Sequence, residues 1–206
     1  RTPAADGKSA YLQYQNVLPV VFGISPPEDR AAIVRNLNDN LISNDYHLSS
    51  TGVFSGRHLP LLLTDFGYSD TVYKLVTQTS APSWGHWIEN DLQTMLEGWS
   101  LQSRSYDHHY WGSISSWFYQ GLAGIRPTQP GYAGITIRPV TPDGLDWVRA
   151  SVDTVVGRIE SKWQRVGRNI SLEVGIPPGS RAQVFCGDQV LDLAAGAYKF
   201  ECGPAK

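Results

Sequence analysis

A chain of 206 residues is long enough for one large domain or two modest ones with cores of their own. Its formal net charge is −2 and only 17% of its residues are charged, which excludes the basic footprint of a nucleic-acid-binding protein. Its apolar runs fall short of the roughly 18–20 residues that a membrane-spanning helix needs, so no membrane anchor is expected. The first residues, Arg1-Thr2-Pro3, hold neither a Met nor a signal-peptide pattern, which is typical of a cut or processed piece.

Helical periodicity dominates the chain up to about residue 123. Apolar residues from Tyr14 to Phe22 recur on one face and predict a first helix. Ser25 is expected to cap a second helix, because two prolines and an acidic residue follow it. After a polar loop at 44–52, further helices are expected at 57–66, 69–79, 91–99 and 113–123. These helices are typical of an array of helix hairpins. They are too few to close a large helical toroid, so we expect that the face against which they would pack is missing.

Beyond Gly124 the apolar pattern changes to period two, after a stretch rich in Pro and Gly. Alternating apolar residues predict strands at 135–138, 158–164, 170–176, 182–186 and 198–202. Short strands at regular spacing, joined by Gly, Pro and Asp turns, are typical of an antiparallel β-sandwich. The sequence therefore predicts an α-then-β protein, with a helical domain at residues 1–130 and a β-sandwich at 131–206.

Two features of the second domain favour secretion. Cys186 and Cys202 share the inward parity of their strands, so one disulfide is expected to join two late strands. Asn169-Ile170-Ser171 forms an N-glycosylation sequon beside the turn expected at Gly167-Arg168. Each signal is weak alone, and together they predict an extracellular protein.

The densest chemistry lies between Pro82 and Gly112, where 31 residues hold four Trp, three His, two Glu and two Asp. Sugar-cleaving sites need this mixture, with carboxylates for acid–base work and flat aromatic walls. The alternative is that the Trp side chains form core and the Glu side chains are solvated or cap helices. No nucleotide-binding loop, nucleophile elbow or zinc-ligand spacing is present, so no metal is expected.

Several short motifs then follow one another in a fixed order. They are HLSSTG at 47–52, GYSD at 67–70, PSWG at 82–85, WIEN at 87–90, TMLEGW at 94–99, DHHYWG at 107–112 and LAGIRP at 122–127. This series resembles glycoside hydrolase family 78, the α-L-rhamnosidases, over about residues 11 to 165.

The resemblance implies the last part of an (α/α)₆ barrel followed by a β-sandwich. It also implies hydrolysis of terminal α-L-rhamnosides with inversion, a reaction that needs no cofactor. The expected partners are a rhamnose-containing glycoside or polysaccharide and the upstream N-terminal part of the same enzyme, which is either continuous with this chain or a separate chain. Neither nucleic acid nor a membrane is an expected partner.

The family motifs also assign roles to residues. The general base falls on Glu97, which is expected in a concave site lined by Trp, and a sugar contact falls on His108, or on His109 if the alignment slips by one. Further candidates for substrate binding are Glu89, Trp84, Trp87 and Trp111. The family's general acid lies in an upstream segment that is absent from this chain.

Two departures from the family pattern lie on the approach to the base. Asp91-Leu92-Gln93 replaces Gly-Ala-Thr, and Leu96 replaces a Trp. They leave open whether the sugar is strictly L-rhamnose. The alternatives are a barrel of the same shape that acts on another sugar or as a lyase, and a carbohydrate-binding remnant without turnover.

Overall fold

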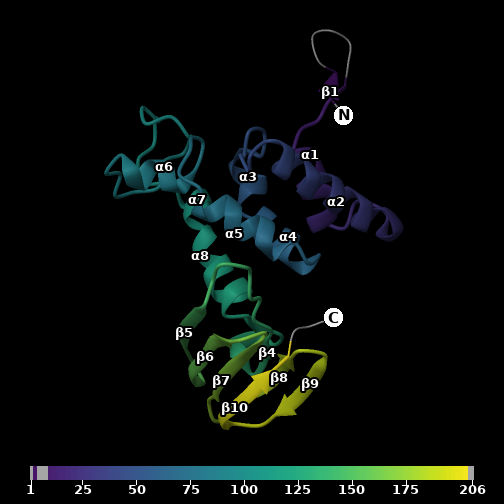
Figure 1. Ribbon diagram of the computed structural model, residues 1–206, viewed down its shortest axis with the longest axis vertical. Coiled ribbons are helices and arrows are strands. Elements are labelled where there is room, and N and C mark those ends of the chain that lie inside the picture. Colours follow the sequence, from purple (N-terminus) through teal and green to yellow (C-terminus); the bar gives the residue numbers. More distant parts are fainter. Residues whose placement is uncertain (1, 4–8, 204–206) are drawn as a thin grey trace. The chain divides into compact units, whose positions relative to one another are not determined.

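The computed structural model describes residues 2–3 and 9–203, which fall into two compact units at 1–114 and 115–206 (Figure 1). In the first unit, the two short strands β1 (Thr2–Pro3) and β2 (Ser9–Ala10) pair in antiparallel fashion. The helices that follow are α1 (Tyr14–Val21), α2 (Pro27–Ser43), α3 (Gly52–Gly56), α4 (Leu59–Asp65), α5 (Ser69–Thr77), α6 (Trp84–Glu89) and α7 (His109–Gly112).

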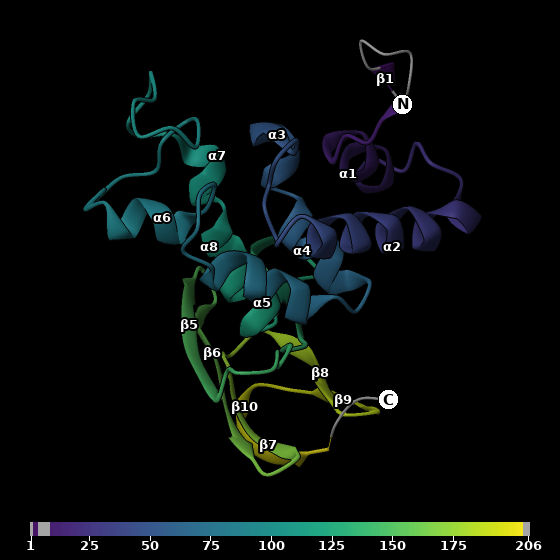
Figure 2. The same cartoon turned by 45° about the horizontal axis from the view of Figure 1, so that its top comes forward.

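The apolar faces of these helices build one core. Helices α1, α2 and α4 contact one another, and α4 contacts α5 (Figure 2). The buried side chains that they contribute include Val17, Val34, Leu37, Leu41, Leu59, Leu63, Val72 and Leu75. The helices expected at 14–22, 57–66 and 69–79 are confirmed to within a few residues, because each carries the apolar stripe that packs here.

Two details of the helical prediction are wrong. Ser25 does not cap α2, because Pro26 takes the cap position in an extended conformation and the Ser25 hydroxyl donates to the Pro19 carbonyl at 3.3 Å. Residues 91–99 are not helical, because Asp91 turns into the left-handed region (φ 57°) directly after α6. The chain then folds back on itself through turns and bends.

The segment between the two units is helical, as expected for 113–123. Helix α8 (Ile114–Trp117) continues into a π-helical turn, η1 (Phe118–Leu122). Within the second unit, two hydrogen bonds join the end of η1 and the residue after it to strand β6 (Gly157–Val166). The Trp163 indole N–H donates to the Leu122 carbonyl at 2.8 Å, and the Ser161 hydroxyl donates to the Ala123 carbonyl at 2.7 Å.

The second unit holds two four-stranded sheets, in the orders β10-β7-β6-β5 and β3-β4-β8-β9. Besides β6, the strands are β3 (Ile125–Pro127), β4 (Gly134–Ile137), β5 (Trp147–Thr154), β7 (Asn169–Ile176), β8 (Arg181–Cys186), β9 (Gln189–Leu193) and β10 (Gly196–Cys202), and a 3₁₀ turn, η2 (Pro130–Tyr132), precedes β4. Every neighbouring pair is antiparallel except β4 and β8, which run parallel. The predicted class, a helical part followed by an antiparallel β-sandwich, is confirmed.

The core of this unit lies between the two sheets. Apolar residues of both sheets form one buried cluster, which includes Ile135, Ile137, Ile159, Trp163, Leu172, Val174 and Val184. Cys186 of β8 and Cys202 of β10 form the predicted disulfide, with their Cα atoms 4.8 Å apart. Because β8 and β10 belong to different sheets, the bond joins the two layers of the sandwich.

Candidate functional site

Four tryptophans pack together around the segment that links α6 to α7. The Trp99 ring lies 4.3 Å from the Trp111 ring, 4.6 Å from the Trp87 ring and 5.4 Å from the Trp84 ring, measured between centroids. Trp84, Trp87 and Trp111 are buried, and Trp99 is partly exposed. The sequence singled out the three buried rings as candidates for substrate binding and missed Trp99, which contacts all of them.

The buried indoles hold the backbone of this segment in place. The Trp111 N–H donates to the Glu97 carbonyl at 2.9 Å, and the Trp87 N–H donates to the Trp99 carbonyl at 3.4 Å. The Trp84 N–H donates to the Trp111 carbonyl at 3.2 Å. A buried indole needs such an acceptor, because an unpaired N–H costs free energy. The cluster therefore acts as a packed wall that fixes the main chain at Glu97.

A pair of backbone hydrogen bonds brings Glu97 and His108 into the same small structure. The Glu97 N–H donates to the Ser105 carbonyl at 3.1 Å, and the His108 N–H donates to the Met95 carbonyl at 2.7 Å. The segment 95–108 is thus closed like a hairpin, with Glu97 near the start of one side and His108 at the end of the other. The Glu97 side chain is exposed, and it makes no hydrogen bond or ion pair within residues 9–203.

His108 has an unusual polar atom. Among the residues that the structure describes, only the His108 Nδ1 atom and the Tyr11 hydroxyl are buried side-chain polar atoms without a hydrogen-bond partner. Burial raises the pKa of Tyr11 to about 12, with the charge of Asp39 adding to the effect. The His108 ring stacks on His109 at 5.6 Å and lies 5.0 Å from Tyr110. Buried polar groups are nearly always paired, so a buried Nδ1 atom without a partner is unusual in this segment.

The last candidate, Glu89, belongs to helix α6. Glu89 is the last residue of α6 and is exposed. Helix α6 is capped by Ser83, whose hydroxyl accepts from the His86 N–H at 3.0 Å. The next residue, Asn90, donates from its side chain to the His86 carbonyl at 2.8 Å. Glu89 is therefore available to solvent, on a helix end that other residues hold.

Five surface hollows are each lined by residues of the second unit alone, and none of the five contains Glu97 or His108. A pocket around Glu97 stays a prediction for the complete barrel. Within the described residues, His, Cys, Asp and Glu side chains do not gather in groups of three that would bind a metal. The same part of the chain holds no helix both long and apolar enough to cross a membrane.

Two family models match the chain in succession. The bacterial α-L-rhamnosidase 6 hairpin glycosidase domain matches residues 5–122, and the bacterial α-L-rhamnosidase C-terminal domain matches residues 124–199. The chain belongs to the bacterial α-L-rhamnosidase family. The resemblance expected from the motifs at 47–127 is thereby confirmed, and the helical hairpins and the sandwich correspond to its two domains.

Individual relatives agree with this assignment. An α-L-rhamnosidase of Streptomyces avermitilis is 32% identical over 193 residues, which are 88% of this chain and 19% of that protein. One of Formosa agariphila is 29% identical over 182 residues, with 84% of this chain and 20% of that protein covered. This chain therefore spans about a fifth of the length of the curated α-L-rhamnosidases that it matches.

Solved structures share the fold as well. The α-L-rhamnosidase of Dictyoglumus thermophilum superposes with a TM-score of 0.86 at 28% identity, covering 97% of this chain and 26% of that one. The native enzyme of Aspergillus terreus gives 0.88 at 26% identity, with coverages of 98% and 25%. The Streptomyces avermitilis α-L-rhamnosidase in complex with L-rhamnose gives 0.81 at 29% identity, with coverages of 98% and 22%.

Proposed function

We propose that this chain is the C-terminal part of an inverting α-L-rhamnosidase and that Glu97 is its general base. The observation that carries the proposal is the placement of Glu97 on a backbone held from both sides. Its N–H is bound by Ser105 and its carbonyl by Trp111, while its carboxylate is exposed and free of protein partners. Such a carboxylate is able to hold and polarise a water molecule.

The chemistry follows from this arrangement. An ionised Glu97 would take a proton from water as the water oxygen attacks the anomeric carbon, on the face opposite the leaving group. A general acid on the other side would protonate the leaving oxygen, and the sugar would leave with inverted configuration. The two carboxyl groups of an inverting pair lie about 6.5–9.5 Å apart to leave room for the water. Two carboxyl groups and water suffice for this step, so no cofactor is required.

The other candidates take supporting roles in this proposal. His108 would contact the sugar from the other side of the closed segment 95–108 that carries the base. The buried rings of Trp84, Trp87 and Trp111 would act from beneath, as the wall that holds the base in position. Glu89, exposed at the end of α6, would support the site without taking part in the proton transfer. The substrate would be a terminal α-L-rhamnoside, the class that the relatives' names indicate.

The partner in this proposal is the upstream part of the enzyme, and the location is extracellular. The general acid would come from an upstream part of the same enzyme, consistent with relatives about five times longer than this chain. Residues 1–130 would complete its barrel and 131–206 would form its sandwich domain. The disulfide and the sequon support secretion, with a glycan on Asn169, whose side-chain amide donates to Glu201 at 3.0 Å near the Gly167 turn.

Substitution of the base tests the mechanism in the complete enzyme. Glu97→Gln keeps the shape of the side chain and removes its basicity, so turnover should fall by about 10²–10⁴-fold with little change in substrate affinity. Glu89→Gln is the matched control and should lower turnover far less. Proton NMR of the first product formed by the wild-type enzyme should show β-L-rhamnose. A Glu97→Gln enzyme with more than about a third of wild-type turnover, or an α-configured first product, would contradict the proposal.

A further inference from the structure

The outer face of the sheet β10-β7-β6-β5 carries a row of charged residues. Arg149 of β5 lies opposite Lys162 of β6, Lys162 lies opposite Glu173 of β7, and Glu173 lies opposite Lys199 of β10. All four residues have the parity opposite to the buried residues of their strands, such as Trp163 and Leu172. Their side chains therefore form one line across four strands, directed away from the sandwich core.

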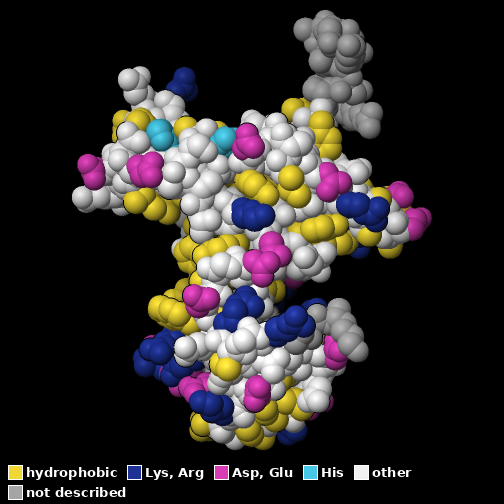
Figure 3. All heavy atoms as spheres, viewed as in Figure 1, with side chains coloured by type: hydrophobic (Ala, Val, Ile, Leu, Met, Phe, Trp, Pro, Cys, Tyr) yellow, Lys and Arg dark blue, Asp and Glu magenta, His cyan; other side chains and the backbone are white. Residues whose placement is uncertain are grey.

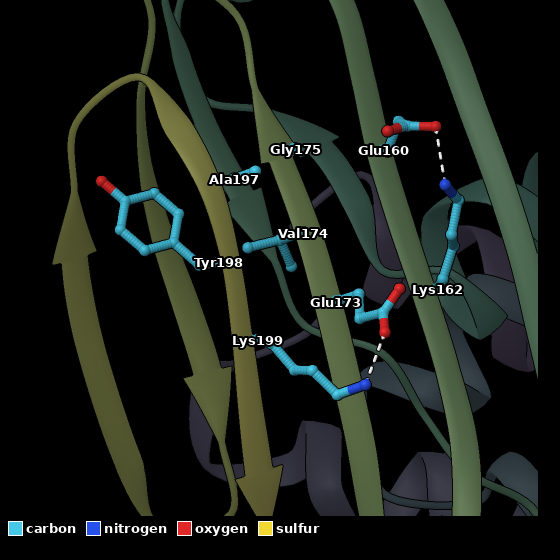
Figure 4. A pocket seen from close by; sticks show the side chains of 8 residues that line it. All are labelled: Glu160, Lys162, Glu173, Val174, Gly175, Ala197, Tyr198 and Lys199. Atoms are coloured by element: carbon cyan, nitrogen blue, oxygen red, sulfur yellow. Dashed lines mark hydrogen bonds and ion pairs between the residues drawn. The ribbon is translucent and has the colours of Figure 1, made fainter.

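Small and flat side chains lie on both sides of this row. On one side Gly175 and Ala197 face each other across β7 and β10 and leave a hollow of about 310 Å³ (Figure 4). On the other side Trp147 pairs with Gln164, beside a second hollow of about 330 Å³. Both hollows are lined by Lys162, Glu173 and Lys199, so they adjoin each other on the two sides of the charged row, and together they are called the groove.

Of the three cations in this groove, two form ion pairs among the described residues and Arg149 does not. Lys162 pairs with Glu160, and Lys199 pairs with Glu173, each at 2.8 Å (Figure 4). Hydrogen bonding to Lys199 keeps the pKa of the Glu173 carboxyl below its usual value, and the charges of Lys162 and Arg149 act in the same direction. Arg149 itself forms no ion pair within the described part of the chain.

That free cation lies beside an exposed aromatic ring. The Arg149 guanidinium carbon is 5.6 Å from the centre of the Trp147 ring, and Trp147 remains 58% exposed. A flat indole surface stacks well against the apolar face of a sugar ring. A guanidinium binds a carboxylate with two parallel hydrogen bonds. The pair is thus suited to a sugar that carries a carboxylate.

We propose that this groove binds an acidic polysaccharide, with Trp147 as the stacking surface and Arg149 as the carboxylate contact. The centres of protein–protein interfaces are depleted in Lys and Glu, which make up most of this row, so a glycan fits the face better than a protein does. The site is separate from the hydrolytic chemistry proposed for Glu97. It would hold the complete enzyme on a uronate-containing chain.

Binding of polygalacturonate by the complete enzyme tests the site. Affinity electrophoresis or titration calorimetry should detect binding that weakens with salt and that is lost when the carboxylates of the same polymer are methyl-esterified. Trp147→Ala and Arg149→Gln should each weaken binding about tenfold or more, as expected for Trp and Arg at the centre of a binding surface. Arg181→Gln, on an exposed position of the other sheet, removes the same charge and should leave binding unchanged.

Folding and catalysis provide the internal controls. All three variants should keep the far-UV circular dichroism and the thermal midpoint of the wild type, because the substituted side chains are exposed. Their hydrolysis of a small aryl α-L-rhamnoside should also be unchanged, which separates this site from Glu97. The proposal is overturned if polygalacturonate does not bind, if the esterified polymer binds equally well, or if both groove variants bind like the wild type. A change of oligomeric state on Trp147→Ala would instead identify a second copy as the occupant.

Discussion

At the scale of single residues, Gln13 is a buried polar residue whose side-chain amide donates two hydrogen bonds and accepts two. Its side-chain N–H₂ donates to the Asn40 side chain at 3.2 Å and to the His47 carbonyl at 3.0 Å. Its side-chain oxygen accepts from the Ser50 N–H at 3.2 Å and from the Thr51 hydroxyl. Gln13 is fully buried, so it fixes the first helical segment to the HLSSTG motif, from which α3 and α4 follow.

We expect Gln13→Ala to lower the free energy of unfolding of the complete enzyme by about 2–3 kcal/mol, because it leaves buried partners unpaired. Urea denaturation followed by Trp fluorescence would measure the change. Gln102→Ala is the matched control, since the Gln102 side chain is exposed. Equal midpoints for the two variants would show that the Gln13 bonds do not contribute to stability.

At the scale of elements, the segment between α6 and α7 decides what the site contains. In a helix at 91–99, the Glu97 N–H would bond within the helix and would not bind the Ser105 carbonyl. The turn at Asp91 and the backbone bonds at Met95 and Glu97 bring the two sides together instead. The four tryptophans then fill the space beneath the segment. The positions of the candidate residues thus depend on packing by rings that lie up to 27 residues apart in the sequence.

The disulfide between Cys186 of β8 and Cys202 of β10 is a second feature at the scale of elements. Removal of the bond by the double substitution Cys186→Ala and Cys202→Ala should lower the stability of the sandwich by about 3 kcal/mol, because the cross-link closes a chain segment of 16 residues. Urea unfolding of the complete enzyme would report this as an earlier transition. Peptide mapping without reductant should recover the two cysteine peptides joined. Recovery of both peptides with free thiols would contradict the prediction.

At the scale of the whole molecule, the helical unit leaves large apolar side chains in solvent. Phe22, Ile24, Phe54 and Ile88 are each more than half exposed, and Figure 3 shows apolar side chains open at the surface of the helices. Exposed apolar surface of this kind marks an interaction site or a tendency to aggregate. In the proposed function, the upstream helices of the barrel would cover it.

Residues 1–206 made alone should therefore fail to hydrolyse p-nitrophenyl α-L-rhamnoside and should aggregate or bind the upstream part. The reasons are the proposed location of the general acid and the exposed apolar side chains. Release of p-nitrophenol and light scattering would measure both effects. Co-expression with the upstream part should restore hydrolysis and give a complex of defined mass. Robust hydrolysis by residues 1–206 alone would contradict the expected division of the site.

The class of fold, the longer helices, five of the ten described strands and the family were predictable from the sequence alone. The change from helical period to period two reports which side of each element is buried, and that is a local property of the chain. The shared inward parity of Cys186 and Cys202 predicted their disulfide for the same reason. The candidates Glu97 and His108 followed from short motifs, which preserve residue types without describing how the backbone between them runs.

Only the tertiary structure decided the features that depend on a distant partner. The sequence pattern did not predict the short helices α3, α6 and α7 or the strands β1, β2, β3, β5 and β9. The parallel pairing of β4 with β8 joins strands more than 40 residues apart. The central place of Trp99, the unpaired Nδ1 of His108 and the row from Arg149 to Lys199 arise in the same way. Periodicity records whether a side chain is buried, whereas register and ring packing depend on which other segment meets it. Register and ring packing are therefore determined only when distant segments of the chain come together in the fold.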